Sequence, residues 1–187
     1  MKNSILLLGA SLISAVGIAQ SNSSTLDQVG ASNSADITQT GAYNIYLGDQ
    51  QGDENTATID QIGAFNQSYT TQLGDLNKAM ISQLGDSNFS EVVQEIEGNT
   101  TEISQEGTGN TDYVYQYDIE NDAAVEQVGD FNYGLSDQFG VQNDVTLTQW
   151  GGDNSAFQIQ SGNTNTATIT QGVDYTGWAS SQVGFAQ

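Results

Sequence analysis

The sequence contains no cysteine, no histidine and no proline, and only 2 of its 187 residues are Lys or Arg. Without Cys or His, the chain has no disulfide, no thiolate or imidazole ligand for a metal ion, and no histidine to shuttle protons. The absence of Pro is typical of a chain whose backbone N–H groups all enter a β-sheet, because Pro cannot donate a hydrogen bond to a neighbouring strand.

Basic residues are nearly absent, whereas Asp and Glu number 23 and give a formal net charge of −21. Such a chain has no cationic surface that could release counterions from phosphate groups, which argues against nucleic-acid binding. The same charge argues against docking on anionic lipid. We therefore expect neither a nucleic-acid partner nor insertion into a membrane.

Residues 1–19 differ from the rest of the chain in composition. A short start with Lys2 precedes the apolar residues 5–18, and the small residues Gly17 and Ala19 precede Gln20. This arrangement predicts a Sec signal peptide that is cleaved near Ala19, so that residues 20–187 form one secreted, extracellular domain. An uncleaved membrane anchor is the alternative, but a helix that spans a bilayer needs about 20 apolar residues.

From Asn22 onward the chain consists of fifteen consecutive units of 11 residues, without insertion or deletion. If the first residue of each unit is position 0, Gln occupies position 6 in all fifteen units, Asn occupies position 0 in fourteen, and Gly occupies position 8 in twelve. A fixed period of this kind predicts a repeat architecture in which each unit stacks on others.

Within a unit, polarity alternates from one residue to the next. Asn55, Ala57, Ile59 and Gln61 alternate with Thr and Asp, and of the 23 acidic residues only Asp112 falls at position 0, 2, 4 or 6. This alternation predicts a strand of about seven residues with one buried face. The Gly at position 8 can take the positive φ of a chain reversal, so each unit is expected to be a strand followed by a turn.

Aromatic residues at position 10 indicate that two units form the true repeat. They are Tyr43, Phe65, Phe131 and Tyr175. The separations in residue number between them are all multiples of 22. The repeat is therefore predicted to be a strand-turn-strand arch. We expect an all-β fold, a flat β-solenoid of two facing parallel sheets built from 11-residue half-repeats in about 7.5 coils.

Stacked arches would bring identical amides to the same height, where each side chain can donate to the next in a ladder. A slip of one residue would bury the acidic face, so the ladders should also hold the register. The first and last units keep the repeat pattern, and we expect uncapped ends to add further chains. The predicted self-assembly ladder comprises Asn22, Gln28, Asn33, Gln39, Asn55, Gln61, Asn66, Gln72, Asn77, Gln83, Asn165, Gln171 and Gln182, and the predicted turn residues are Gly30, Gly41, Gly52, Gly63, Gly74, Gly85 and Gly184.

The N-x-A-x-I-x-Q-x-G-x-x-N unit resembles the curlin repeat of bacterial curli, the functional amyloids of the biofilm matrix, over residues 22–187. The resemblance implies a secreted structural protein that polymerises with itself, end to end, into adhesive cell-surface fibres. It also implies an outer-membrane secretion pore and a nucleator subunit as partners. Only Lys78 is basic after the signal peptide, whereas the nucleator of that family is more basic, so the major subunit is favoured over the minor nucleator.

Other functions are less well supported by the pattern. A monomeric ice-binding or ligand-binding solenoid is suggested by Thr164, Thr166, Thr168 and Thr170, but position 3 of successive units holds no continuous run of Thr. We expect no enzyme, because the acidic residues are scattered over a solvated face and form no evident acid–base pair. We likewise expect no cofactor and no metal site, since the turns lack the sequence of calcium-binding repeats.

Overall fold

A computed structural model describes residues 12–13 and 21–172 of the chain. The described residues form fifteen β-strands in two parallel sheets and contain no helix that could span a membrane. The eight-stranded sheet contains, in spatial order, β1 (Leu12–Ile13), β3 (Ser34–Ala42), β5 (Thr56–Ala64), β7 (Lys78–Asp86), β9 (Thr100–Thr108), β11 (Asp122–Asp130), β13 (Asp144–Gly152) and β15 (Thr166–Gln171). The seven-stranded sheet contains β2 (Ser23–Val29), β4 (Ile45–Gln51), β6 (Gln67–Asp75), β8 (Phe89–Glu97), β10 (Thr111–Tyr117), β12 (Tyr133–Phe139) and β14 (Ser155–Ser161).

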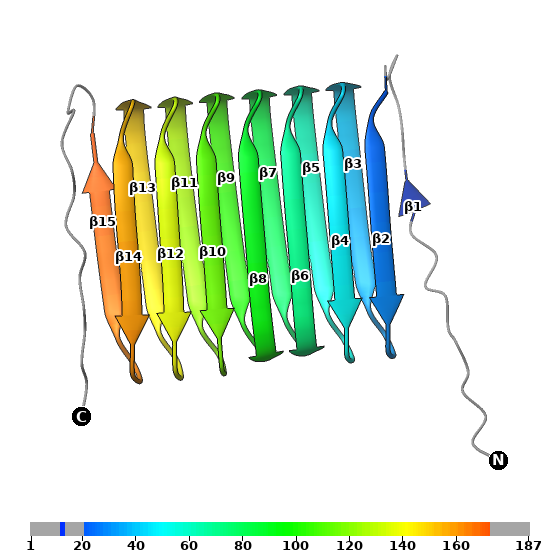
Figure 1. Ribbon diagram of the computed structural model, residues 1–187, viewed down its shortest axis with the longest axis vertical. Coiled ribbons are helices and arrows are strands. Elements are labelled where there is room, and N and C mark those ends of the chain that lie inside the picture. Colours follow the sequence, from blue (N-terminus) through cyan, green and yellow to red (C-terminus); the bar gives the residue numbers. More distant parts are fainter. Residues whose placement is uncertain (1–11, 14–20, 173–187) are drawn as a thin grey trace.

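The two sheets lie face to face, and the chain passes from one to the other at every turn (Figure 1). Each strand from β2 to β15 pairs in parallel with the strand two units away, and the partners are 22 residues apart, as in the pairing of Gln61 with Gln83. Within the described residues, β2 to β15 make about seven turns of a flat solenoid. The predicted fold class and the predicted two-unit arch are therefore confirmed.

The eight-stranded sheet supplies most of the apolar core. Its inward positions 2 and 4 carry a small residue and an aliphatic one in nearly every strand, such as Ala57 and Ile59 in β5. Ile59, Ile81, Ile103 and Leu147 are each at most 2% exposed and belong to one continuous cluster. Burying such a side chain contributes about 1.5–3 kcal/mol relative to leaving it in water.

The seven-stranded sheet has more varied inward residues. A large inward side chain lies next to a glycine, which leaves room for it. Tyr46 is fully buried, and its hydroxyl lies 2.7 Å from Thr70 Oγ1 on the next strand. The ring occupies the space next to Gly48, where a Cβ atom would lie 2.3 Å from the Tyr46 hydroxyl. Close packing of this kind leaves no room for a side chain at position 48.

The predicted signal peptide lies almost wholly outside the described residues. Its only described part is β1, which pairs with Asp36 and Ile37 of β3. The predicted ladder residue Gln182 and the predicted turn residue Gly184 also lie outside the described residues.

Candidate functional site: the amide ladders and the turns

The glutamines at position 6 form two continuous hydrogen-bonded ladders, one in each sheet. In the eight-stranded sheet, Gln61 Nε2 donates to Gln83 Oε1 at 2.8 Å, and Gln83 Nε2 donates to Gln105 Oε1 at 2.9 Å. The ladder of this sheet extends from Gln39 to Gln171, and that of the seven-stranded sheet from Gln28 to Gln160. Each amide donates toward the C-terminal end of the solenoid, so the ladders have one direction.

From Gln39 to Gln171, each ladder glutamine also ties the two sheets together. The second N–H of Gln61 donates to the backbone carbonyl of Ile45 at 3.1 Å, and that of Gln72 donates to the carbonyl of Thr56 at 3.0 Å. In both cases the acceptor lies in the strand of the opposite sheet. Both amide N–H groups and the side-chain oxygen are thereby used, which is what allows these amides to be fully buried.

The asparagines at position 0 make a different network that braces the turns. The backbone N–H of Asn66 donates to Asn44 Oδ1 at 3.0 Å, and Asn66 Nδ2 donates to the carbonyl of Gly85 at 2.7 Å. From Asn88 onward the side chains are also joined to one another, as in the 3.2 Å bond from Asn88 Nδ2 to Asn66 Oδ1. The bonds that the asparagine Oδ1 atoms accept point toward the N-terminal end, opposite to the direction of the glutamine ladders, whereas the bonds to the glycine carbonyls point toward the C-terminal end.

The glycines at position 8 stack at a distance that excludes any side chain. Gly63 has a φ of +122°, and a Cβ atom there would lie 2.0 Å from the carbonyl oxygen of Gly85 in the next coil. Glycine remains paired in the sheet, and the reversal continues to position 10, where Phe65 has a φ of +61°. Each turn therefore uses two residues with positive φ, of which the sequence pattern indicated only the first.

The predicted ladder and turn residues take the same places throughout the described chain. Those in the middle of the stack, such as Asn66 and Gln72, are fully buried, whereas those near the ends are partly exposed. The partly exposed set comprises Asn22, Gln28, Asn33, Gln39 and Asn165. Their assignment to self-assembly stays a prediction.

Acidic residues at position 9 have a role in the turns that the sequence reasoning missed. Asp53 Oδ1 accepts the backbone N–H of Ala31 at 2.7 Å, and Asp75 Oδ1 accepts the N–H of Asp53 at 2.8 Å. Asp86 and Asp130 make the corresponding bonds to Ala64 and Thr108. The sequence signal was present, because Asp53 and Asp75 are 22 residues apart at the same position.

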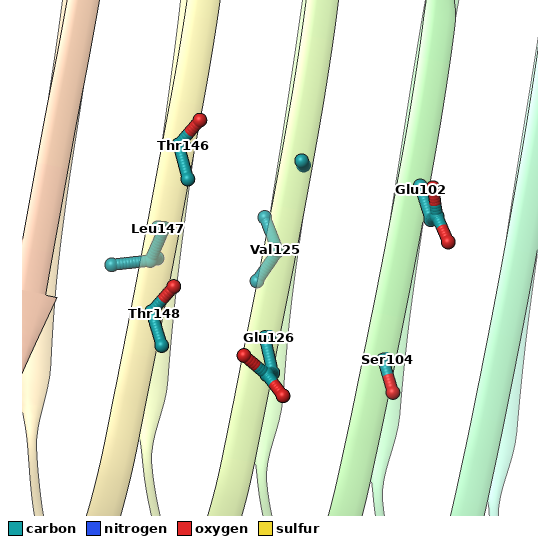
Figure 2. A pocket seen from close by; sticks show the side chains of 8 residues that line it. Glu102, Ser104, Val125, Glu126, Thr146, Leu147 and Thr148 are labelled. Atoms are coloured by element: carbon teal, nitrogen blue, oxygen red, sulfur yellow. The ribbon is translucent and has the colours of Figure 1, made fainter.

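A shallow depression of about 310 Å³ lies on the outer face of the eight-stranded sheet, over β9, β11 and β13 (Figure 2). It forms because the small Ala124 lies between Glu102 and Thr146 in neighbouring strands. Glu102, Glu126 and Thr148 also contribute to its rim. Among the described residues, no three acidic side chains come close enough together to hold a metal ion.

The outward residues around this depression test the ice-binding alternative, which needs a continuous array of threonines. Thr146, Thr148, Thr168 and Thr170 lie side by side on β13 and β15. Toward the N-terminus, however, the same rows continue as Ala124 and Glu126 and then as Glu102 and Ser104. The outward threonines thus form a small patch rather than a flat array along the sheet.

Comparison with known proteins gave one kind of match. The sequence profile of the curlin associated repeat matches residues 52–85, 70–95, 120–151 and 142–172, which together make up just over half of the chain. No curated protein and no solved structure matches the chain. The matched spans contain part of both amide networks, among them Asn66, Gln72 and Gln83.

Proposed function

The chain belongs to the curlin-repeat family, whose repeats are those of curli-type amyloid fibre subunits, and we propose that it is the major subunit of an extracellular fibre. In this proposal the chain is exported by Sec, passes an outer-membrane pore, and polymerises end to end into the fibres of a biofilm matrix. The proposal is supported above all by the unbroken ladders of identical buried amides along the solenoid axis.

The direction of the ladders supports growth in a head-to-tail sense. Within the described residues, no amide donates to the Oε1 atoms of Gln28 and Gln39, which are the first acceptors of the two ladders. Once residues 1–19, which include the β1 strand paired with β3, are removed, a second chain whose last coil lay against β2 and β3 could continue both ladders with its own amide donors. Parallel strands also leave unpaired backbone groups at the edge of a sheet, which act as a template for another chain.

The charge of the chain supports the assignment as major subunit. Outside residues 1–19 the only basic residue is Lys78, and its side chain is exposed on β7. A fibre built mostly of this chain would present acidic side chains to water on both faces, such as Glu126 on the eight-stranded sheet and Glu91 on the seven-stranded sheet. Such a surface favours solubility of the secreted chain before it assembles.

The central test is incubation of the purified chain comprising residues 20–187. We expect unbranched fibres with a reflection near 4.8 Å along the fibre axis, the spacing of stacked strands. A chain that stays monomeric at high concentration would contradict the proposal. A chain that forms no fibres alone but seeds those of another curlin-repeat protein would instead be assigned as the minor nucleator.

End templating can be tested separately from fibre formation. Replacing Gln28 near one end, or Gln182 near the other, by Leu is expected to slow fibre elongation more than replacing Gln105 in the middle of the array. The readout is the elongation rate from preformed wild-type seeds. Equal slowing by all three substitutions would contradict growth through the ladder ends.

A further inference from the structure

Asp112 is the only acidic residue at an inward position of the repeat, and it lies in β10 with 0% exposure. It occupies position 2, where the neighbouring strands β8 and β12 carry Ser90 and Gly134. The side chain therefore lies between the two sheets, in the layer that holds the core.

The enclosing space fits the carboxyl group closely. A Cβ atom on Gly134 would lie 2.2 Å from Asp112 Oδ1 and 2.8 Å from Leu147 Cδ2. The carboxyl group thus takes the room of the missing side chain at position 134, beside an aliphatic side chain from the opposite sheet. Gly134 is what makes an acid possible at this place in the core.

The surroundings of the carboxyl group stabilise a negative charge only weakly. Among the described residues, neither Oδ1 nor Oδ2 of Asp112 accepts a hydrogen bond, although both atoms are buried. Burial raises the pKa of Asp112 to about 7, and the nearby backbone N–H of Tyr113 lowers it only in part. A buried carboxylate without a partner is far more costly than the neutral acid.

The other titratable groups near β10 point outward, away from this space. Lys78, the only cation of the repeat region, lies on β7 and points outward there. Partial burial raises the pKa of the outward Tyr133 hydroxyl, and the neighbouring Tyr113 and Asp112 raise it further. The outward groups on the strands packed around Asp112 are Tyr113, Tyr115 and Tyr117 on β10, Glu91, Glu95 and Glu97 on β8, Tyr133 and Asp137 on β12, Glu102 and Glu106 on β9, Asp122, Glu126 and Asp130 on β11, and Asp144 on β13.

We propose that the coil that contains β10 closes more favourably when Asp112 is protonated, which makes folding of the solenoid sensitive to pH. In mildly acidic surroundings the carboxyl group enters the core as a neutral acid. In neutral or alkaline surroundings folding must either take up a proton or bury a charge, and the folded chain is less stable. The proposal concerns the folding of a single chain, so it can be tested separately from fibre formation.

The direction of the effect follows from the raised pKa. Below the ordinary value of 3.8 both the folded and the unfolded chain carry the proton, and the stabilisation is fully present. Between that value and about 7 only the folded chain holds the proton, so stability falls as pH rises. Above about 7 the loss is complete, and the folding equilibrium constant has fallen roughly a thousand-fold.

The test compares the folding of the wild-type chain, Asp112→Ser and Glu91→Gln in urea between pH 5.5 and pH 8, followed by far-UV circular dichroism. Serine is the residue that this chain itself carries at the same position in β6 and β8. Glu91→Gln removes one charge from the outer face of the adjacent strand and serves as the matched control. Burial also raises the pKa of Asp122 and Asp137, which contribute equally to all three chains. We expect the folding equilibrium constant of the wild type and of Glu91→Gln to fall over this range by a factor roughly 30 times larger than that of Asp112→Ser.

Two results would overturn the proposal. One is an equal pH dependence of Asp112→Ser and the wild type. The other is a direct titration of the folded chain, by NMR of carbon-13-labelled Asp side chains, that places Asp112 near its ordinary pKa. The titration needs no substitution, so it decides the question even if Asp112→Ser does not fold.

Discussion

The inward positions of the eight-stranded sheet carry mostly Ala and Ile, Val or Leu, whereas those of the seven-stranded sheet include Tyr46, Gly48, Thr70, Asp112 and Gln158. Their outer faces differ in the opposite sense. The eight-stranded sheet presents mainly Thr, Ser, Asp and Glu, while the seven-stranded sheet presents a row of contacting rings formed by Tyr69, Phe89, Tyr113, Tyr133 and Phe157.

What the two sheets share is the pair of amide networks at positions 0 and 6 and the same 22-residue pairing. Register therefore does not depend on an apolar core in each sheet. One sheet supplies the apolar half of the core, and the other can carry polar inward residues because its side chains pack against that half. We conclude that the ladders hold the alignment and the eight-stranded sheet supplies most of the hydrophobic stability.

Position 8 should show the largest difference, at the two places where the seven-stranded sheet has a residue other than Gly. In the seven-stranded sheet Ile96 and Asp118 replace Gly at position 8, with φ of +81° and +82°, whereas Gly107 of the eight-stranded sheet would place a Cβ atom 2.1 Å from the carbonyl oxygen of Gly129. Gly107→Ala is expected to cost about 4 kcal/mol, from backbone strain and overpacking together. Ile96→Ala is expected to leave the free energy of unfolding nearly unchanged. If urea unfolding gave the same loss of stability for Gly107→Ala and Ile96→Ala, this prediction would be wrong.

Truncation at position 4 should give the next largest effect. Ile103→Ala in the eight-stranded sheet removes a side chain that is 1% exposed and should cost about 3 kcal/mol in the free energy of unfolding. Ser136→Ala at the same position of the seven-stranded sheet removes only a long bond of 3.4 Å to Gln158 Oε1 and should cost about 1 kcal/mol. If Ser136→Ala were as destabilised as Ile103→Ala, the two sheets would contribute equally to the stability of the core, and the prediction would be wrong.

The ladders should respond equally in both sheets. Gln94 in β8 and Gln105 in β9 each accept one amide bond and donate another along the stack, at 2.9 Å in all four cases. Replacing either by Ala leaves buried amide groups without a partner and should cost about 2 kcal/mol. A clear difference between the two variants, measured by urea unfolding, would show that one sheet alone holds the register.

The aromatic row on the outer face should have the smallest effect. Tyr113 contacts Phe89 and Tyr133 with ring centroids 5.4 and 5.9 Å apart. Tyr113→Ser should lower the free energy of unfolding by about 1 kcal/mol, since such ring pairs contribute little beyond buried area. Ala124→Ser on the opposite face is the control and should change nothing measurable.

Much of this arrangement can be predicted from the chain itself. The alternation in residues 55–61 identified the inward row, and the spacing of Tyr43 and Phe65 identified the arch, whose rings stack 5.0 Å apart. The position-9 acids were missed because a turn acid looks like ordinary solvated charge until the backbone N–H of the preceding coil is seen beside it. Asp112 stood out in the sequence, but its dependence on Gly134 appears only when strands 22 residues apart are placed next to each other.

The sequence by itself determined the strands, the inward amides, the glycine turns and the 22-residue arch, because these follow from side-chain alternation and from identical residues recurring at a constant interval. Only the tertiary structure decided the opposite directions of the glutamine and asparagine bonds, the unequal chemistry of the two sheets, and the unpartnered state of Asp112. Those features depend on which atoms meet through space across a coil or between the sheets, and no local pattern along the chain specifies such neighbours.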